Sequence, residues 1–480
     1  MRSWKKCLIG VGFLAGMFLS PLENYAQDQQ SDAPPKPAAR VLLPLPDLSG
    51  EQQDADQEKQ ALRPDRGPIS GVQDPTLGTP EVRHSYWISG IRYSNIVRSN
   101  SLYSTTNSER NTTSYVSGDL SALEGWSHSL LSLNYSGGGF TSSDQAQGSG
   151  QYHQFGAVYE IDQRRWQALL VDQFSYLPES QFGFGGTAGL AYVGITGTLA
   201  VSLPGLQNQF LPGQTILTAT GRRYSNASAA QLTYEVSRRG SITVAGVLGL
   251  LRFTNSGNID NTTDILNAGY NYAITRKSTV GLSYRFSEYH FPGAPQALGD
   301  HIAQFVYGRR ITGKLALNLA CGPEVTTFRV AINGSARRAS GLGSGGSLTY
   351  AFRQGSVALS YSHGVSNGSG VFPGARSDLA EATWSRQLTR VWKGILNFGY
   401  AKNNQIVAAS GLTSPRFDTW LAGAGWSRPL GRTRDLSLGY QARMQAANVV
   451  SCAGPNCGSN FTLHEVSLSF QWRTGPQVLR

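Results

Sequence analysis

The stretch that decides the fold is DLAEATWSRQLTRVWKGILNFGYAK, residues 378–402. Apolar or aromatic side chains occupy every second position in both of its halves: Ala380, Ala382 and Trp384, then Trp392, Gly394, Leu396, Phe398 and Tyr400. A period of two is typical of a β-strand with one apolar face and one mixed face. Because a short basic break at Thr389-Arg390 joins the two runs, they predict an antiparallel hairpin. Each run has about ten residues, which is the length that crosses a hydrocarbon layer when the strand is tilted.

The same alternating unit recurs along the chain from residue 83 onward. This repetition predicts an all-β fold, a transmembrane antiparallel up-and-down β-barrel of about 18 strands. A count of about 16 is the alternative, because the run at 86–95 and the segment around Phe328 are ambiguous in pattern. The predicted strands are 86–95, 113–123, 128–136, 152–161, 166–176, 230–237, 242–253, 265–274, 280–289, 302–312, 315–321, 348–353, 357–363, the two runs of 378–402, 417–427, 436–444 and 463–472.

The connections between these strands alternate in length. Short turns such as 163–165, 239–240 and 431–432 are separated by long polar connections such as 365–376 and 403–414. Barrels of the bacterial outer membrane have short periplasmic turns and longer external loops. The sequence therefore predicts an outer-membrane location with the short turns facing the periplasm.

The composition excludes a helical membrane protein. Of 480 residues, 40% are hydrophobic, 15% are charged and 56 are glycine. No apolar run beyond the N-terminus reaches the roughly 18 residues that a spanning helix needs. The formal net charge of +11 is compatible with nucleic acid, a lipopolysaccharide surface or anionic solutes. Many basic residues fall in predicted turns, such as Arg164-Arg165, where they are expected to be solvated turn residues. The predicted partners of the barrel are outer-membrane lipid and lipopolysaccharide, and no nucleic acid.

The chain divides into three predicted parts. Residues 1–26 have the pattern of a signal peptide, with Arg2, Lys5 and Lys6 ahead of an apolar core. Residues 27–82 are rich in Pro and Gln and have almost no aromatics, so they bury too little surface to fold. They are predicted to form a disordered periplasmic arm, and a tether to peptidoglycan or to a periplasmic partner is its functional alternative. Residues 83–480 form the predicted barrel.

One face of each predicted strand is mixed or charged and is expected to line a wet lumen. A charged side chain that faced hydrocarbon would cost several kcal/mol, so charges of both signs suit the inside. The predicted lumen residues are Glu160, Glu235, Arg285, Arg353, Glu381, Lys393, Arg443 and Glu465. Structural pairing of these residues with one another is the alternative to a role in solute passage.

The longest internal connection, residues 177–224, contains many apolar side chains that would sit poorly in water as an extended loop. A connection this long normally has a role. It contains PESQFGFGG at residues 178–186. In this motif, and in its place after the fifth predicted strand, the chain resembles the general porins of Gram-negative bacteria. Their third external loop folds into the barrel and carries Pro-Glu-Phe-Gly-Gly, which extra residues interrupt here.

The resemblance implies that Glu179, Gln181, Phe182 and Phe184 line a pore constriction, with Glu179 as its acidic residue. No definite arginine cluster in the sequence faces that glutamate, so ion selectivity stays open. A loop that caps the barrel or forms a subunit contact is the alternative, and a homotrimer is the expected assembly if such a contact exists.

The cysteines predict no catalytic or metal chemistry. Cys452 and Cys457 flank a short polar stretch in the last external loop, which in an exported protein predicts a disulfide. Cys321 continues an apolar alternation and is expected to be an unpaired thiol facing lipid. The seven histidines have no metal-ligand spacing, and no phosphate loop or nucleophile elbow is present. We therefore predict no metal site, no cofactor and no enzymatic activity.

The leading functional prediction is a porin-like channel for passive diffusion of small hydrophilic solutes. It depends on the size of the predicted barrel, its mixed-charge lumen and the long connection. A non-conducting structural or surface-binding barrel is the first alternative, and a hydrolase carried on the barrel is the second.

Overall fold

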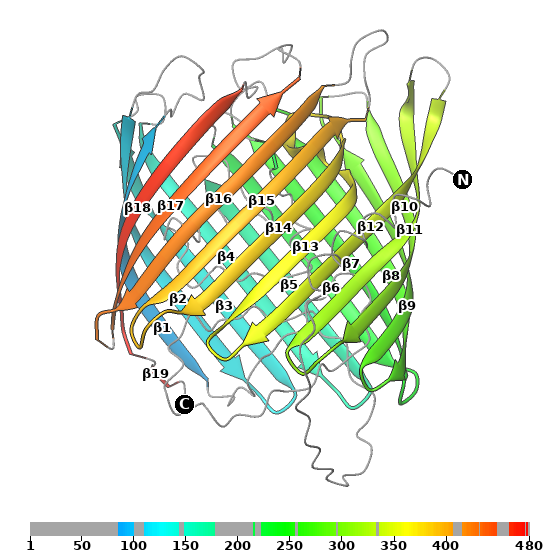
Figure 1. The fold of residues 1–480 in the computed structure, drawn as a ribbon, viewed down its shortest axis with the longest axis horizontal. Helices are drawn as coiled ribbons and strands as arrows, with labels where there is room; N and C mark the ends of the chain where they lie inside the picture. The colour runs from blue at the N-terminus through cyan, green and yellow to red at the C-terminus, as the bar shows by residue number, and fades with distance from the viewer. Residues whose placement is uncertain are drawn as a thin grey trace, which may run out of the picture.

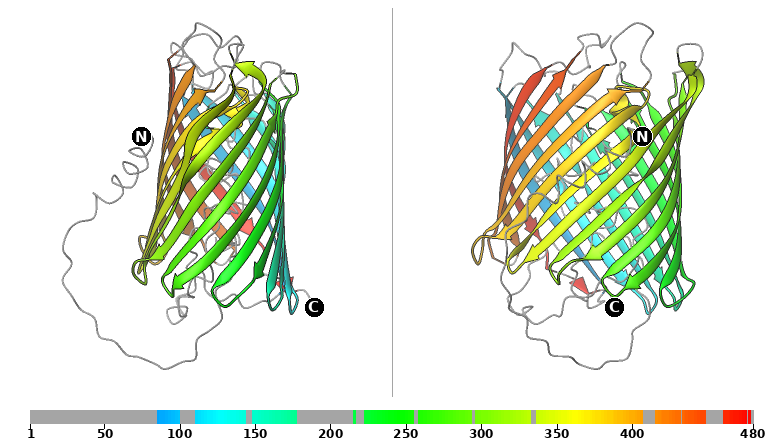
Figure 2. Two further views of the ribbon diagram at one scale, coloured as in Figure 1. Left: turned by 90° about the vertical axis from the view of Figure 1, so that its right-hand side faces the viewer. Right: turned by 45° about the vertical axis from the view of Figure 1, so that its right-hand side comes forward.

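A computed structural model describes residues 85–99, 110–143, 148–177, 215–216, 222–254, 258–293, 296–332, 336–406, 415–431, 433–448, 460–475 and 477–478. These residues form one closed β-barrel of long tilted strands (Figures 1 and 2). The predicted signal peptide and periplasmic arm lie outside the described residues. No helix in the described part of the chain is long and apolar enough to cross a membrane.

The strands follow one another around the barrel in sequence order. They are β1 (Tyr86–Ser99), β2 (Arg110–Gly125), β3 (Ser129–Ser142), β4 (Ser149–Asp162), β5 (Trp166–Leu177), β6 (Arg223–Glu235), β7 (Gly240–Phe253), β8 (Asn261–Thr275), β9 (Ser278–His290), β10 (Ala297–Arg310), β11 (Leu315–Ile332), β12 (Ala336–Phe352), β13 (Gly355–Ser366), β14 (Ala375–Gln387), β15 (Lys393–Gln405), β16 (Arg416–Pro429), β17 (Arg434–Ala447), β18 (Phe461–Arg473) and the short β19 (Gln477–Val478).

Each strand from β1 to β18 pairs antiparallel with the next, and β18 pairs with β1 to close the barrel. The prediction of an antiparallel up-and-down barrel of 18 strands is therefore confirmed. The hairpin predicted from residues 378–402 is β14 and β15, which pair from Ala375 opposite Gln405 to Gln387 opposite Lys393. The segment around Phe328, which was ambiguous in the sequence, is the external end of the long strand β11.

Side chains alternate between two environments along every strand. In β18, Val466, Leu468 and Phe470 are exposed, whereas Glu465 and Ser467 between them are buried. Large exposed apolar side chains recur on the same face of the other strands, and buried polar ones recur on the opposite face. Side chains on the inner wall of a closed barrel are covered by one another and by the surrounding wall. The buried polar face therefore lines the lumen, and the exposed apolar face is the outer surface. Such a surface matches a hydrocarbon layer.

The barrel closes along a seam where β18 pairs with β1. The chain continues along this seam beyond its last aromatic residue. β18 pairs with β1 up to Arg473 opposite Gly90, and β19 then pairs with the first residues of β1. Between these pairings, Thr474 N donates to Ser89 O at 2.8 Å, and Ser89 N donates to Thr474 Oγ1 at 3.1 Å. The tail therefore extends the seam at the periplasmic end.

Deleting residues 474–480 is expected to lower the free energy of unfolding by about 1–3 kcal/mol, because the hydrogen bonds of the tail are lost at the seam. Urea unfolding of the barrel in liposomes measures this change. Thr474→Val, which removes the hydroxyl and keeps the backbone bond, should show a smaller loss. Equal stability of the truncated and full chains would show that the tail does not support closure.

Candidate functional site: the lumen and its inner tip

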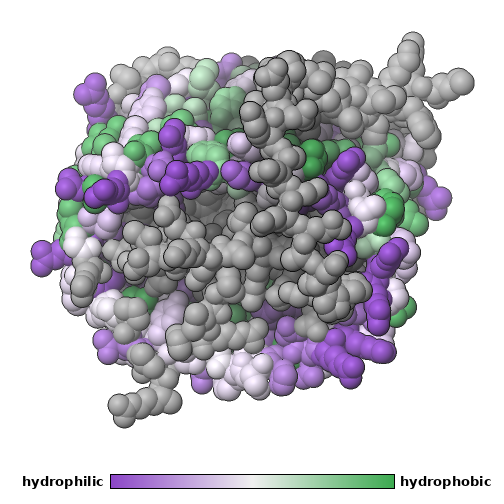
Figure 3. Space-filling view, turned by 60° about the horizontal axis from the view of Figure 1, so that its bottom comes forward, coloured by the Kyte–Doolittle hydropathy of each residue, from purple (hydrophilic) through white to green (hydrophobic). Residues whose placement is uncertain are grey.

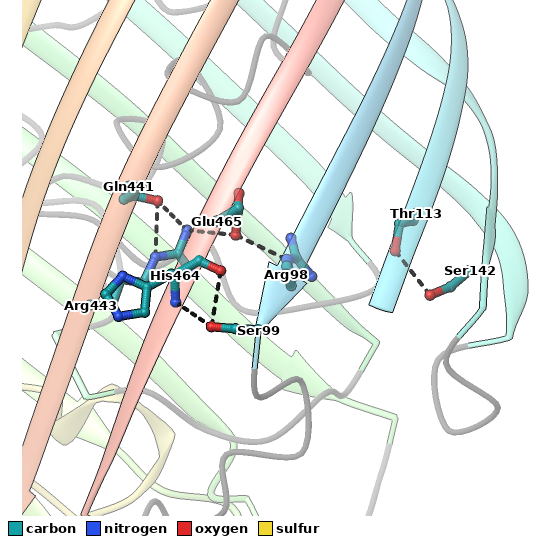
Figure 4. Close-up of polar contacts among 8 residues, drawn as sticks. All are labelled: Arg98, Ser99, Thr113, Ser142, Gln441, Arg443, His464 and Glu465. Atoms are coloured by element: carbon teal, nitrogen blue, oxygen red, sulfur yellow. Dashed lines mark hydrogen bonds and ion pairs between the residues drawn. The ribbon is translucent and has the colours of Figure 1, made fainter. Parts of the chain in front are cut away.

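The seam between β1, β17 and β18 carries a charged cluster on its lumen face (Figure 4). Arg98 Nε donates to Glu465 Oε2 at 2.9 Å, and Arg443 Nη2 lies 3.7 Å from the same oxygen. Arg443 also donates from Nε to Gln441 Oε1 at 2.9 Å. The side chain of Glu465 is 1% exposed, so one buried carboxylate is shared by two guanidinium groups.

A second cluster lies nearer the periplasmic end of the same wall. Arg92 Nη2 and Arg473 Nη2 donate to Gln471 Oε1 at 2.7 and 2.8 Å, and Gln471 Nε2 donates to both carboxylate oxygens of Asp119. The amide of Gln471 thus connects two arginines with one carboxylate. The seam wall therefore carries two clusters, each with two arginines and one acid.

The wall formed by β3, β4 and β5 is polar but mostly uncharged. Gln167 Nε2 donates to Glu160 Oε1 at 2.6 Å, while both side-chain polar atoms of Gln154 have no hydrogen-bond partner within the described residues. Asn134, Ser132 and Ser136 lie buried on the same face. Amide and hydroxyl groups of this kind can bind the hydroxyl or carbonyl groups of a solute.

The β13–β14 hairpin leaves the wall at its external end. Pairing of β11 with β12 extends to Ile332, but pairing of β12 with β13 stops at Ser344. β13 and β14 still pair with each other as far as Ser366. The long ends of β11 and β12 project at one side of the barrel (Figure 1). We call residues 367–374, which connect β13 to β14, the inner tip.

Apolar contacts place the inner tip and its base inside the barrel. Val365 at the base packs with Tyr289, Leu298 and Phe328, whose side chains are buried on the lumen side. Within the tip, Phe372 is 3% exposed and packs with Ile216 and Phe417. The tip therefore joins strands that lie far apart around the barrel. It also meets a described part of the long connection between β5 and β6, because Ile216 belongs to that connection.

Hydrogen bonds fix the inner tip in this position. Ile259 N, in the loop after β7, donates to Gly370 O at 2.7 Å. Thr215 N donates to Ser369 Oγ at 3.1 Å, and Thr215 Oγ1 donates to Asn403 Oδ1 of β15 at 3.0 Å. The tip is thus hydrogen-bonded to two separate segments of the chain, and Thr215 connects it to a third, β15.

A buried carboxylate holds the base of the hairpin. Glu324 is 0% exposed, its Oε1 accepts from Val365 N at 3.2 Å, and its Oε2 lies 3.3 Å from Arg376 Nη2. Arg376 reaches this position across Gly341, where a Cβ would lie 2.7 Å from its Nη2. Asp300 lies nearby and accepts from Thr326 Oγ1 at 3.1 Å. The lumen therefore has a second charged region opposite the uncharged strands, and it anchors the inner tip.

The structure distributes the predicted lumen residues among three positions. Those inside the wall, on its lumen face, are Glu160, Arg285, Glu381, Arg443 and Glu465. Those on the lumen face at the periplasmic ends of their strands are Glu235 and Lys393. Arg353 is not in the wall: β12 ends at Phe352 and β13 begins at Gly355, so Arg353 is exposed in the turn between them. At the turn end of the barrel, hydrophilic residues gather around the rim (Figure 3).

Two further predicted sites lie outside the described residues. They are the constriction residues Glu179, Gln181, Phe182 and Phe184 and the disulfide partners Cys452 and Cys457. Cys321 lies on the outward face of β11 and is disulfide-bonded, so the expectation of an unpaired thiol is wrong. In the described part of the chain, no group of three or more His, Cys, Asp or Glu side chains is arranged to hold a metal ion.

Sequence reasoning missed the inner tip, Arg98 of the first seam cluster and the charged residues of the second seam cluster. Residues 365–376 were assigned to a polar external connection, although Val371 and Phe372 are an apolar pair within it. Apolar residues in a polar loop were the signal used for residues 177–224, and the same signal was present here. Arg98 was missed because the first strand was predicted to end at residue 95, whereas β1 extends to Ser99.

Comparison with known proteins finds no matching family model and no matching curated protein. The chain is similar to solved structures of outer-membrane proteins. Against OccK5 (OpdH) of Pseudomonas aeruginosa, the TM-score is 0.42 with 11% identity, over 82% of this chain and 98% of that one. Against OccAB3 of Acinetobacter baumannii, the TM-score is 0.41 with 10% identity, over 81% of this chain and 99% of that one.

The architecture itself determines where the protein resides. A closed antiparallel barrel with an apolar outer surface, a polar lumen and short turns at one end is the arrangement of bacterial outer-membrane proteins. The strands leave no free sheet edge, which is the condition for β-structure to cross hydrocarbon. The protein is a transmembrane β-barrel of the bacterial outer membrane.

Proposed function

We propose that this protein is a porin-like channel through which small hydrophilic solutes diffuse passively, and that it favours small organic anions. The observation that carries the proposal is the seam wall of the lumen. Its two bonded clusters hold four arginines, Arg92, Arg98, Arg443 and Arg473, against two carboxylates, Asp119 and Glu465. An 18-stranded barrel is wide enough for an aqueous channel, and charges in its wall create a field that selects among ions.

The positions of the inner tip and of the uncharged wall support the same proposal. The tip narrows the external half of the lumen, so solutes pass between it and the wall. The amide and hydroxyl groups of β3, β4 and β5 face the lumen and offer hydrogen bonds to a solute whose charged group is drawn to the seam. Carboxylates suit the arginines, because a guanidinium group binds a carboxylate through two parallel hydrogen bonds.

A non-conducting barrel is the second candidate, and one observation favours it. Many lumen-facing polar side chains are almost fully buried, among them Arg98, Asn271 and Asn403. A barrel whose lumen is filled by its own side chains in this way would not conduct, and it would act through its surface. The hydrolase alternative gains no support from the described strands, where imidazoles bond to Tyr or Asp side chains, as in His153 and His363.

Conductance recordings in planar bilayers distinguish the channel from the non-conducting barrel. The full chain is expected to give stepwise conductance, with a reversal potential in a salt gradient that indicates anion preference. Liposome swelling should be faster with small organic anions than with uncharged sugars of the same size. Absence of conductance, both in the full chain and in a variant without the inner tip, would exclude the channel. Conductance without anion preference would exclude only the proposed selectivity.

A further inference from the structure

The outward face of the barrel carries a repeated polar contact between tyrosines at mid-strand and partners in the external half of the next strand. Five tyrosines each have the hydroxyl group hydrogen-bonded to a histidine or aspartate on the next strand. The pairs and their distances are Tyr135 to His153 Nδ1 (2.9 Å), Tyr284 to His301 Nδ1 (2.7 Å), Tyr440 to His464 Nδ1 (2.9 Å), Tyr361 to Asp378 Oδ1 (2.9 Å) and Tyr400 to Asp418 Oδ1 (2.8 Å). We call these ten residues the external belt.

All five contacts share one geometry. The tyrosine lies on a strand that runs toward the external end, and its partner lies on the following strand. Tyr135, for example, is opposite Phe155 in the register, and its partner His153 is two residues closer to the external end. Diagonal neighbours of this kind are within reach of an aromatic side chain. The pairs lie on β3–β4, β9–β10, β13–β14, β15–β16 and β17–β18. Each tyrosine is the seventh or eighth residue of its strand, counted from the periplasmic end, so the belt marks one level on the outer surface.

The three histidines of the belt offer donors to what surrounds the barrel. When a tyrosine O–H donates to Nδ1, the neutral imidazole carries its own proton on Nε2. His464 is exposed, and His153 and His301 are partly exposed on the outer face. In that tautomer each of these rings has an N–H that can bond to an acceptor outside the protein.

The two aspartates of the belt have basic side chains beside them. His363 Nδ1 lies 2.6 Å from Asp378 Oδ1, and Arg416 Nη2 lies 2.6 Å from Asp418 Oδ2. Lys402 is opposite both aspartates in the strand register. Further exposed cations near the external ends of the strands are Arg110 and Arg338. The belt region thus offers N–H donors and positive charge to an anionic acceptor.

The distribution of the belt indicates its occupant. A partner protein would contact one side of the barrel, whereas the five pairs lie on hairpins from β3 to β18. Only the surrounding lipid layer meets all of them at one level. We propose that the external belt binds the phosphorylated sugar headgroups of a glycolipid in the outer leaflet, with imidazole N–H groups and cations as donors to phosphate. This inference concerns the outer surface and does not depend on channel activity.

The test measures binding of lipopolysaccharide that retains only lipid A and the inner core, using the purified full chain. The readout is the temperature at which the folded barrel unfolds on heating, at increasing lipid concentration. The external variant removes three hydroxyls of the belt: Tyr135→Phe, Tyr284→Phe and Tyr440→Phe. The matched control removes three hydroxyls from exposed tyrosines near the periplasmic turns: Tyr234→Phe, Tyr272→Phe and Tyr350→Phe.

We expect the lipopolysaccharide to stabilise the unaltered chain more than phosphatidylcholine does. The external variant should need about tenfold more lipopolysaccharide for the same stabilisation, which corresponds to about 1.4 kcal/mol. The control should behave as the unaltered chain. Equal losses in both variants would overturn the proposal, and so would equal stabilisation by dephosphorylated lipid A. A shift that requires an added protein rather than lipid would assign the belt to a protein partner and overturn it as well.

Discussion

Excision of the inner tip is expected to raise the single-channel conductance by at least about twofold, because an 18-stranded barrel without an inward segment leaves a wide aqueous lumen. Ser366 and Ala375 are directly opposite each other in the β13–β14 register. A two-residue Asn-Gly turn can therefore replace residues 367–374 with little strain, since this dipeptide suits a tight hairpin. Planar-bilayer recordings in the same salt measure the change.

Two comparisons isolate the effect of the inner tip. The double variant Thr215→Val and Ser369→Ala removes the side-chain hydrogen bonds between the tip and Thr215, and it leaves the backbone bond from Ile259 and the chain length unchanged. It should give conductance that fluctuates between the level of the unaltered chain and that of the excised chain. If excision leaves the conductance unchanged while the barrel stays folded, the tip does not limit passage and the narrowing lies elsewhere.

Glu465→Gln is expected to change stability and selectivity together. Its carboxylate is the shared acid between Arg98 and Arg443, so its removal leaves two buried guanidinium groups without that countercharge. Loss of one partner from a buried ionic cluster costs about 3–5 kcal/mol. The same change makes the seam wall more positive. A unit charge about 7 Å from a monovalent solute in water contributes about 0.6 kcal/mol, with opposite sign for anions and cations. Anion permeability should therefore rise about threefold and cation permeability should fall about threefold, so that their ratio rises about sevenfold.

The opposite change in the same cluster should have the opposite effect on selectivity. Arg443→Gln removes one positive charge and should lower the anion-to-cation permeability ratio about sevenfold by the same electrostatic reasoning. Glu124→Gln on the outward face near a periplasmic turn is the matched control and should leave the ratio unchanged. Reversal potentials in a salt gradient measure all three variants. If Glu465→Gln and Arg443→Gln shift the ratio in the same direction, the seam charges do not set it.

The strand pattern could be read from the sequence because each strand meets lipid on one side and water on the other. That boundary imposes a period of two, which residues 378–402 show in both halves of the hairpin. Because every strand that crosses the membrane must show this alternation, the number of strands could also be counted from the sequence. The strand ends were predicted less well: β11 and β12 extend far beyond the predicted 315–321 and 348–353. Outside the hydrocarbon layer, nothing in the medium enforces the alternation.

The sequence by itself also determined which face of each strand is polar, and therefore that Arg443 and Glu465 face inward. Only the tertiary structure decided that Arg98 meets Glu465, because the two residues come from opposite ends of the chain and become neighbours when the barrel closes. It alone decided that residues 367–374 lie inside the lumen, where Val365, Phe372 and Ser369 find partners from distant strands. Periodicity follows from the local environment of a strand, whereas contacts across a closed barrel depend on register and closure, which no local pattern contains.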